Sequence, residues 1–178
     1  MEIISELNDL GKKLYLRFID DIKKMHEYVN YEVPFEDVKK DFDLFIEAIL
    51  IDVSLADDKL ELMEISFIEE LFPKCVILDS KRIDKELLLK EVKDLLNQVP
   101  EFVKLSVCAD KKADSELIIN NPTYSQITYD FLRRLPNYIK FVDGFVDVKE
   151  DKALKSSLQS VIKYYKSKYV TYAPRRKE

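Results

Sequence analysis

The chain contains only two glycines in 178 residues, Gly11 and Gly144. A dinucleotide-binding turn and a phosphate-binding loop both need several glycines, because the backbone must come close to the phosphate groups. The sequence therefore excludes these two nucleotide-binding motifs.

Histidine and cysteine are also scarce. His26 is the only histidine, which excludes a multi-histidine metal site, and we expect it to be a solvated residue on a helix surface. Cys75 and Cys108 have neither the spacing of a metal site nor the number needed for a disulfide framework, so we expect two buried thiols in a reducing compartment. Because the usual catalytic arrangements are missing, we predict that the protein is not an enzyme.

Long apolar runs are missing too. No stretch approaches the roughly 18 apolar residues that cross a bilayer, so we expect no membrane span. The N-terminus has an early acidic residue, Glu2, and no basic region, which is unlike a secretory signal. With 47% hydrophobic and 35% charged residues, the sequence predicts a cytoplasmic, charge-rich helical protein.

Apolar residues recur at gaps of three and four along most of the chain, and β-type alternation is missing. The pattern predicts an all-α fold, a compact bundle of about seven or eight helices. It indicates helices at 3–29, 35–53, 59–72, 83–99, 101–109, 124–135, 137–143 and 148–169, with an exit loop at 110–115. We expect Asp58 and Glu61 to form a capping box, and Pro136 to break or kink the helix before it.

We interpret residues 1–178 as a single all-helical domain. Its parts are an N-terminal helix (1–30), a first hairpin (34–72), connecting helices (80–110), a second hairpin (122–170) and a basic tail (171–178). The two hairpins look like repeats, because a shift of 91 positions aligns Asp52 with Asp143 and Phe67 with Leu158.

The second repeat contains the pattern Asp-Gly-x-Val-Asp-x-x-Glu at residues 143–150. In one interpretation this is a turn, in which Gly144 ends a helix in the left-handed conformation and Asp147 caps the next. In the other, the carboxylates hold a divalent cation, which prefers oxygen ligands. The candidate metal residues are Asp143, Asp147 and Glu150, with Asp52, Asp57 and Asp58 from the first repeat. An EF-hand is excluded, because Ile139 and Phe141 would occupy ligand positions.

The second repeat, with Asp143, Gly144, Val146, Asp147 and Glu150, resembles the tellurite-resistance TerB-like family. The first repeat departs from that pattern, since Val53 replaces the glycine and Lys59 the glutamate. The resemblance implies a fold of paired helical hairpins and a stress or metal-resistance role. It also implies binding or scaffolding rather than a known reaction, and divalent-cation binding by acidic residues.

Charge is unevenly distributed. Residues 36–70 contain twelve acidic and three basic residues, which suits a cation, a basic partner or a solvated helix face. The C-terminus instead alternates basic residues and tyrosines, at Lys163, Tyr164, Tyr165, Lys166, Lys168, Tyr169, Tyr172, Arg175, Arg176 and Lys177. This segment suits stacking on nucleic acid. Alternatively, its lysines complement the dipole at a helix C-terminus, and Tyr165, Tyr169 and Tyr172, which fall at core-facing spacing, pack in the bundle. We predict a non-enzymatic interaction or scaffold module with a protein partner; the alternatives are a weak divalent-cation binder and a nucleic-acid accessory protein.

Overall fold

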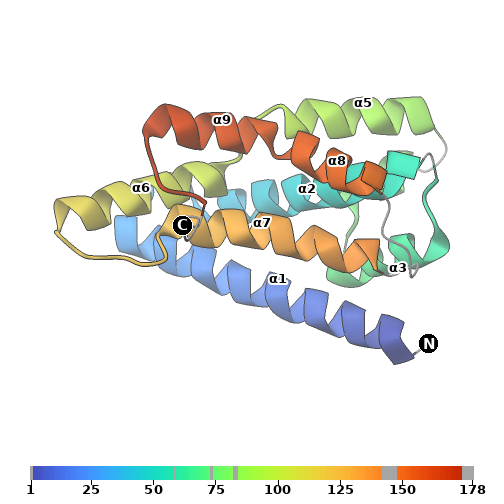
Figure 1. Cartoon of the computed structure of the whole chain (residues 1–178), viewed down its shortest axis with the longest axis horizontal. Helices are drawn as coiled ribbons and strands as arrows, with labels where there is room; N and C mark the ends of the chain where they lie inside the picture. Colours follow the sequence, from blue (N-terminus) through green and yellow to red (C-terminus); the bar gives the residue numbers. More distant parts are fainter. Residues whose placement is uncertain (1, 58, 73, 82–83, 142–147, 174–178) are drawn as a thin grey trace.

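The structure is a computed structural model, and it describes residues 2–57, 59–72, 74–81, 84–141 and 148–173. The described residues are all helical or connecting, which confirms the all-α class (Figure 1). The helices are α1 (Glu2–Val29), α2 (Phe35–Ser54), α3 (Leu62–Leu71), α4 (Val76–Lys81), α5 (Lys85–Leu96), α6 (Glu101–Ser115), α7 (Tyr124–Lys140), α8 (Val148–Ser157) and α9 (Gln159–Lys168), with a 3-10 turn η1 (Leu55–Asp57) after α2.

Helix α2 is the centre of the bundle, as its broad apolar face predicts. It packs against α5, α8, α7 and α6, and its middle is buried on every side from Phe45 to Leu50. A helix that is apolar around most of its circumference must be covered by several neighbours.

Aromatic rings join α2 to three other helices. Phe42 of α2 lies 5.1 Å from the Phe102 ring of α6 and 5.6 Å from the Phe131 ring of α7, centroid to centroid. Phe18 of α1 stacks on Phe131 with an interplanar angle of 7°. All four rings are buried, and they place α1, α2, α6 and α7 around one core.

Three largely buried carboxylates connect helices by capping them from a neighbouring element. Glu47 of α2, 2% exposed, accepts hydrogen bonds from the backbone N–H groups of Val76, Ile77 and Leu78 at the start of α4. Asp41 of α2 accepts from the N–H of Glu101 at the start of α6. Asp110 of α6 accepts from the N–H groups of Tyr124 and Ser125 at the start of α7. Two acidic residues of the first hairpin, Asp41 and Glu47, therefore stabilise the fold by capping other helices.

Asp110 also explains why the expected exit loop at 110–115 is wrong. This polar run continues α6 to Ser115, because Asp110 and Ala113 both face the bundle and are buried. The burial raises the pKa of the Asp110 carboxyl, while hydrogen bonds from Ser125 and Tyr124 lower it.

Several other boundaries differ from the prediction. Pro136 is buried inside α7, which continues past it to Lys140, so of the expected break or kink the break is wrong. The capping box of α3 uses Glu61 and Glu64, three residues after the expected pair. Helix α4 was not predicted, and α8 and α9 are separated only by Leu158, where one helix was expected.

The expectations for His26 and Cys108 were also wrong. His26 is half-buried; its Nε2 lies 2.7 Å from the Val33 carbonyl oxygen, and its ring packs against Tyr31 and Phe35. Cys75 is buried as expected, but Cys108 is exposed.

Candidate functional site

The predicted cation site is only partly within the described residues. Asp143, Asp147 and Asp58 lie outside them. Asp52 accepts a 2.6 Å hydrogen bond from the Ser157 hydroxyl of α8, and Asp57 accepts one from the backbone N–H of Lys59. Glu150 is buried in α8. Within the described ranges no three His, Cys, Asp or Glu side chains form a metal-binding group, so the cation hypothesis stays a prediction.

An ion pair between a buried lysine and a half-exposed aspartate in the second hairpin had not been predicted. Lys140, 3% exposed at the end of α7, donates to the carboxylate of Asp151 in the first turn of α8. The Lys140 ammonium holds the pKa of the Asp151 carboxyl below its usual value, by its hydrogen bond first and its charge second. This pair fixes α7 to α8.

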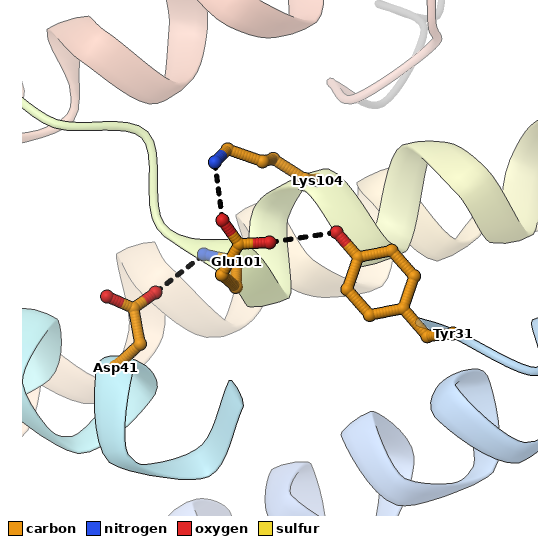
Figure 2. Close-up of polar contacts among 4 residues, drawn as sticks. All are labelled: Tyr31, Asp41, Glu101 and Lys104. Atoms are coloured by element: carbon orange, nitrogen blue, oxygen red, sulfur yellow. Dashed lines mark hydrogen bonds and ion pairs between the residues drawn. The ribbon is translucent and has the colours of Figure 1, made fainter. Parts of the chain in front are cut away.

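A second polar cluster joins the start of α6 to α2 and to the segment between α1 and α2, which contains Tyr31 (Figure 2). One oxygen of the Glu101 carboxylate accepts from the Tyr31 hydroxyl at 2.9 Å and the other from the Lys104 ammonium, while the Glu101 N–H donates to Asp41. Burial, then the bond to Glu101, raises the pKa of Tyr31. The bond to Glu101 raises the pKa of Lys104. Both groups therefore keep their protons, and the cluster holds helices together.

Cys108 lies one turn beyond Lys104 on α6. Partial burial is the main cause that raises the pKa of its thiol, and the charge of Lys111 only partly offsets it. A thiol with a raised pKa is a poor nucleophile at neutral pH, because the thiolate is the reactive form.

An open groove of about 900 Å³ lies between α1 and α7. Its volume falls in the range of about 300–1,000 Å³ that is usual for binding sites. Its apolar lining residues are Leu14, Phe18, Ile127 and Phe131, and its charged ones are Arg17, Asp21, Asp130 and Arg134. On each helix these residues follow gaps of three and four, so one face of α1 and one of α7 form the two walls.

The loop between α6 and α7 closes one end of this groove. Residues 120–123 line it, and Thr171 from the C-terminal segment joins them. Thr123 donates from its hydroxyl to the Thr171 carbonyl oxygen, and Gln126 donates from its side-chain amide to the Ala173 carbonyl oxygen. The side-chain nitrogen of Asn120 is buried and has no hydrogen-bond partner among the described residues.

The same loop exposes three consecutive apolar side chains. Leu117 is 89% exposed, Ile118 48% and Ile119 96%. In Figure 1 this loop projects from one end of the bundle, opposite to the end that carries α3. We call residues 117–119 the apolar loop. Sequence analysis overlooked it, although three apolar residues directly before Asn-Asn-Pro, outside a helical pattern, were a visible signal.

The apolar loop begins with a strained backbone. Leu117 has a φ of 57°, in the left-handed region. The N–H of Leu117 donates to the Asp114 carbonyl oxygen and that of Ile118 to the Ala113 carbonyl oxygen, which is the hydrogen-bond pattern of a Schellman helix end. Glycine usually occupies this position, because a Cβ costs about 1–2 kcal/mol in the left-handed conformation.

Most of the C-terminal tyrosines are used for packing. Tyr165 is completely buried, its hydroxyl lies 3.0 Å from that of Ser106, and Tyr172 stacks on its ring. Tyr164 is half-buried beneath the Lys168 ammonium. Tyr169 is 96% exposed, although its spacing had suggested a core position. The surface for stacking on nucleic acid is therefore smaller than the sequence pattern indicates.

No protein-family model matches the chain, and no curated protein or solved structure matches it. The TerB-like resemblance accordingly stays a prediction based on residues 143–150. Among the described helices, none is long and apolar enough to cross a membrane.

Proposed function

We propose that this protein is a non-enzymatic interaction module that binds a polypeptide through the apolar loop and the adjacent α1–α7 groove. The observation that carries the proposal is Leu117, a large apolar side chain that is 89% exposed at a left-handed backbone position. A binding or scaffolding role is also what the TerB-like resemblance implies.

The apolar loop does not serve the stability of the folded chain. Leucine at a left-handed position is less stable than glycine, and exposed side chains contribute little burial. Residues that cost stability are concentrated at functional positions, where another requirement retains them. For a surface loop with contiguous apolar side chains, that requirement is contact with another molecule.

The groove supplies what a polypeptide needs beside such a loop. Leu14 on one wall and Ile127 on the other are half-buried and offer apolar surface to a partner's side chains, whereas the Phe18 and Phe131 rings beneath them are buried. An apolar surface with few oriented polar groups is typical of binding sites.

The proposal is tested by affinity capture with tagged wild-type protein and two variants. Ile119→Asp places a charge at the last residue of the apolar loop, where wild-type Ile119 is 96% exposed and contributes little to folding. Leu62→Asp is the matched control, because Leu62 is 84% exposed at the start of α3, at the other end of the bundle. We expect wild type and Leu62→Asp to retain the same polypeptide and Ile119→Asp to lose it.

Equal capture by all three proteins would contradict this function, because binding would then not depend on the apolar loop. Circular dichroism of each variant checks that the helices remain folded.

A further inference from the structure

We propose that the exposed face of α8 and α9 binds a single-stranded nucleic acid, with lysine ammonium groups on its phosphates and the Tyr169 ring stacked on a base. This inference goes beyond the proposed polypeptide binding, because neither helix forms the apolar loop or a wall of the α1–α7 groove. In Figure 1, α8 and α9 follow one another along the side of the bundle opposite to α1.

Four exposed lysines lie on one face of the two helices. Helices α8 and α9 are separated only by Leu158, and the N–H groups of Leu158 and Ile162 still donate to the carbonyl oxygen four residues earlier, so the helical path continues between them. With the exposed Gln159 in the middle, these lysines follow gaps of three and four along that path, over about 20 Å. We call them the lysine face: Lys152, Lys155, Lys163 and Lys166. The opposite side of the helices is buried in the bundle, at Leu154, Leu158, Val161 and Tyr165.

The lysine face is positive in a chain that is negative as a whole. Residues 152–173 contain five lysines and no aspartate or glutamate, whereas the formal charge of the whole chain is −5. Asp151, directly before this stretch, is paired with Lys140. None of the ion pairs between described residues involves the lysine face. A row of cations without counter-charges attracts a polyanion, and the acidic remainder of the chain directs that polyanion to this face.

The helix dipole explains only half of the lysine face. A cation is favoured by the dipole within the last turn of a helix. Lys155 and Lys166 meet this condition in α8 and α9. Lys152 and Lys163 lie in the middle of their helices, where the dipole gives them no advantage. Neither the dipole nor an ion pair therefore accounts for these two lysines, and binding of an external anion does.

Tyr169 adds an aromatic ring at the end of the lysine face. Its side chain is 96% exposed, and its φ of 57° is left-handed. The N–H of Tyr169 donates to the Lys166 carbonyl oxygen and that of Val170 to the Tyr165 carbonyl oxygen, the same Schellman pattern as at Leu117. Glycine fits this position better than tyrosine, and the ring gains no burial there. An exposed ring beside ammonium groups is suited to an unpaired base, because every base has a flat face on which it can stack.

This combination favours a single strand over other polyanions. In a duplex the bases stack on one another and offer no free face to Tyr169. A helix that binds a membrane surface buries its apolar side in the lipid, but the apolar side of α8 and α9 is already buried in the bundle. An acidic polypeptide has carboxylates for the lysines, but these carboxylates give the exposed ring no partner.

Fluorescence anisotropy of the full chain tests the charge contacts, with labelled oligothymidylate and oligouridylate of about 12 nucleotides. Lys163→Gln combined with Lys166→Gln removes two charges from the lysine face. Lys12→Gln combined with Lys13→Gln is the charge-matched control, because both lysines are exposed on α1. We expect the control to bind within about twofold of wild type and the lysine-face variant to bind about tenfold more weakly. The tighter of the two oligonucleotides identifies DNA or RNA as the source of the strand.

The dependence of binding on salt distinguishes phosphate contacts from a structural effect. The slope of log affinity against log salt concentration should be about 1.4 smaller for the lysine-face variant, since each phosphate contact of a single strand contributes about 0.7. Equal binding by the two double variants overturns the proposal, and so does a wild-type protein that binds neither oligonucleotide.

Two substitutions of Tyr169 test the stacking contact. Tyr169→Gly suits the left-handed backbone, so the variant should fold at least as well as wild type by circular dichroism. It should nevertheless bind the single strand about tenfold more weakly, whereas Tyr169→Phe keeps the ring and should bind like wild type. A Tyr169→Gly variant that binds like wild type overturns the stacking contact.

Competition identifies the class of polyanion. Unlabelled oligothymidylate, a duplex of the same length, polyglutamate and phosphatidylserine vesicles are each added at equal charge concentration to the complex of wild type with the labelled oligonucleotide. We expect the unlabelled single strand to displace the label most effectively. If the duplex, polyglutamate or the vesicles displace it as well or better, the face binds that other polyanion, and the single-strand proposal is overturned.

Discussion

Replacing Leu117 by glycine should make the fold more stable, although it removes a large side chain. The left-handed φ of 57° costs a residue with a Cβ about 1–2 kcal/mol relative to glycine. The glycine variant, in turn, loses about 0.4–1 kcal/mol of stability relative to a residue with a side chain, because glycine has more conformational entropy in the unfolded chain. The Leu117 side chain is 89% exposed, so its removal sacrifices little burial. The difference is a gain of about 0.5–1 kcal/mol in the free energy of unfolding.

The measurement is urea unfolding of the full chain, followed by circular dichroism. Leu117→Ala is the control, because alanine keeps the strain and loses the same exposed surface; it should lie within about 0.5 kcal/mol of its parent. A glycine variant no more stable than the alanine variant would show that Leu117 is not strained, and the main support for the interaction function would be lost. With Ile119 intact, Leu117→Gly should also weaken the polypeptide capture proposed for the apolar loop.

Further substitutions test the core, the ion pair and the cation hypothesis. Gly11→Ala should destabilise by about 1 kcal/mol or more in urea unfolding, because its Cβ would lie 2.7 Å from the Phe67 ring and overpacking outweighs helix propensity. Glu47→Gln should cost about 2 kcal/mol in the same assay, since one amide oxygen replaces two carboxylate oxygens that accept from three N–H groups. The pKa of Asp151 is lowered in the folded state, so its contribution is present above the ordinary aspartate pKa and lost below it. Melting curves of wild type and Asp151→Asn should accordingly converge as pH falls below about 4. If the turn binds a cation, millimolar calcium or magnesium should raise the melting temperature, and Asp147→Ala should abolish that rise.

Apolar periodicity predicted the helices whose burial follows from local spacing. The positions of α1 and α2 and the central place of α2 were all predicted, because one helix face has to meet a core. The burial of Tyr165 likewise agrees with its spacing. The periodicity of apolar residues shows which side of each helix faces the core, and this is enough to predict how the main helices are arranged.

The wrong predictions have a different cause. Tertiary contacts decide whether a polar or small residue lies in a loop, caps a helix or packs in the core. Asp110 resembles a loop residue in sequence, but here it is a buried cap for a helix that begins fourteen residues later. Gly11 resembles a weak point in α1, yet the Phe67 ring fills the space that a side chain would take. Neither partner can be identified from local sequence, because each contact depends on how two distant helices cross.

The candidate surface was missed for a related reason. The sequence prediction of a site concentrated on residues 143–150, because their carboxylates are suitable ligands for a cation. The solvent exposure of residues 117–119, in contrast, cannot be predicted from residue type. The left-handed conformation of Leu117 is equally invisible in the sequence, where a glycine would have marked the helix end. The groove needs two helices far apart in the chain, and only the fold brings Phe18 and Phe131 together.

The carboxylates that cap neighbouring helices have a consequence for how the bundle opens. Asp41 connects α2 to the start of α6, and Asp110 connects α6 to the start of α7, while Glu47 connects α2 to α4. When α2 loses its structure, α4 and α6 each lose the anion that satisfies their first N–H groups, and α7 follows through α6. Amide hydrogens in these four helices should therefore exchange with solvent in one cooperative event, whereas those of α3 and α9 can exchange through smaller, local openings.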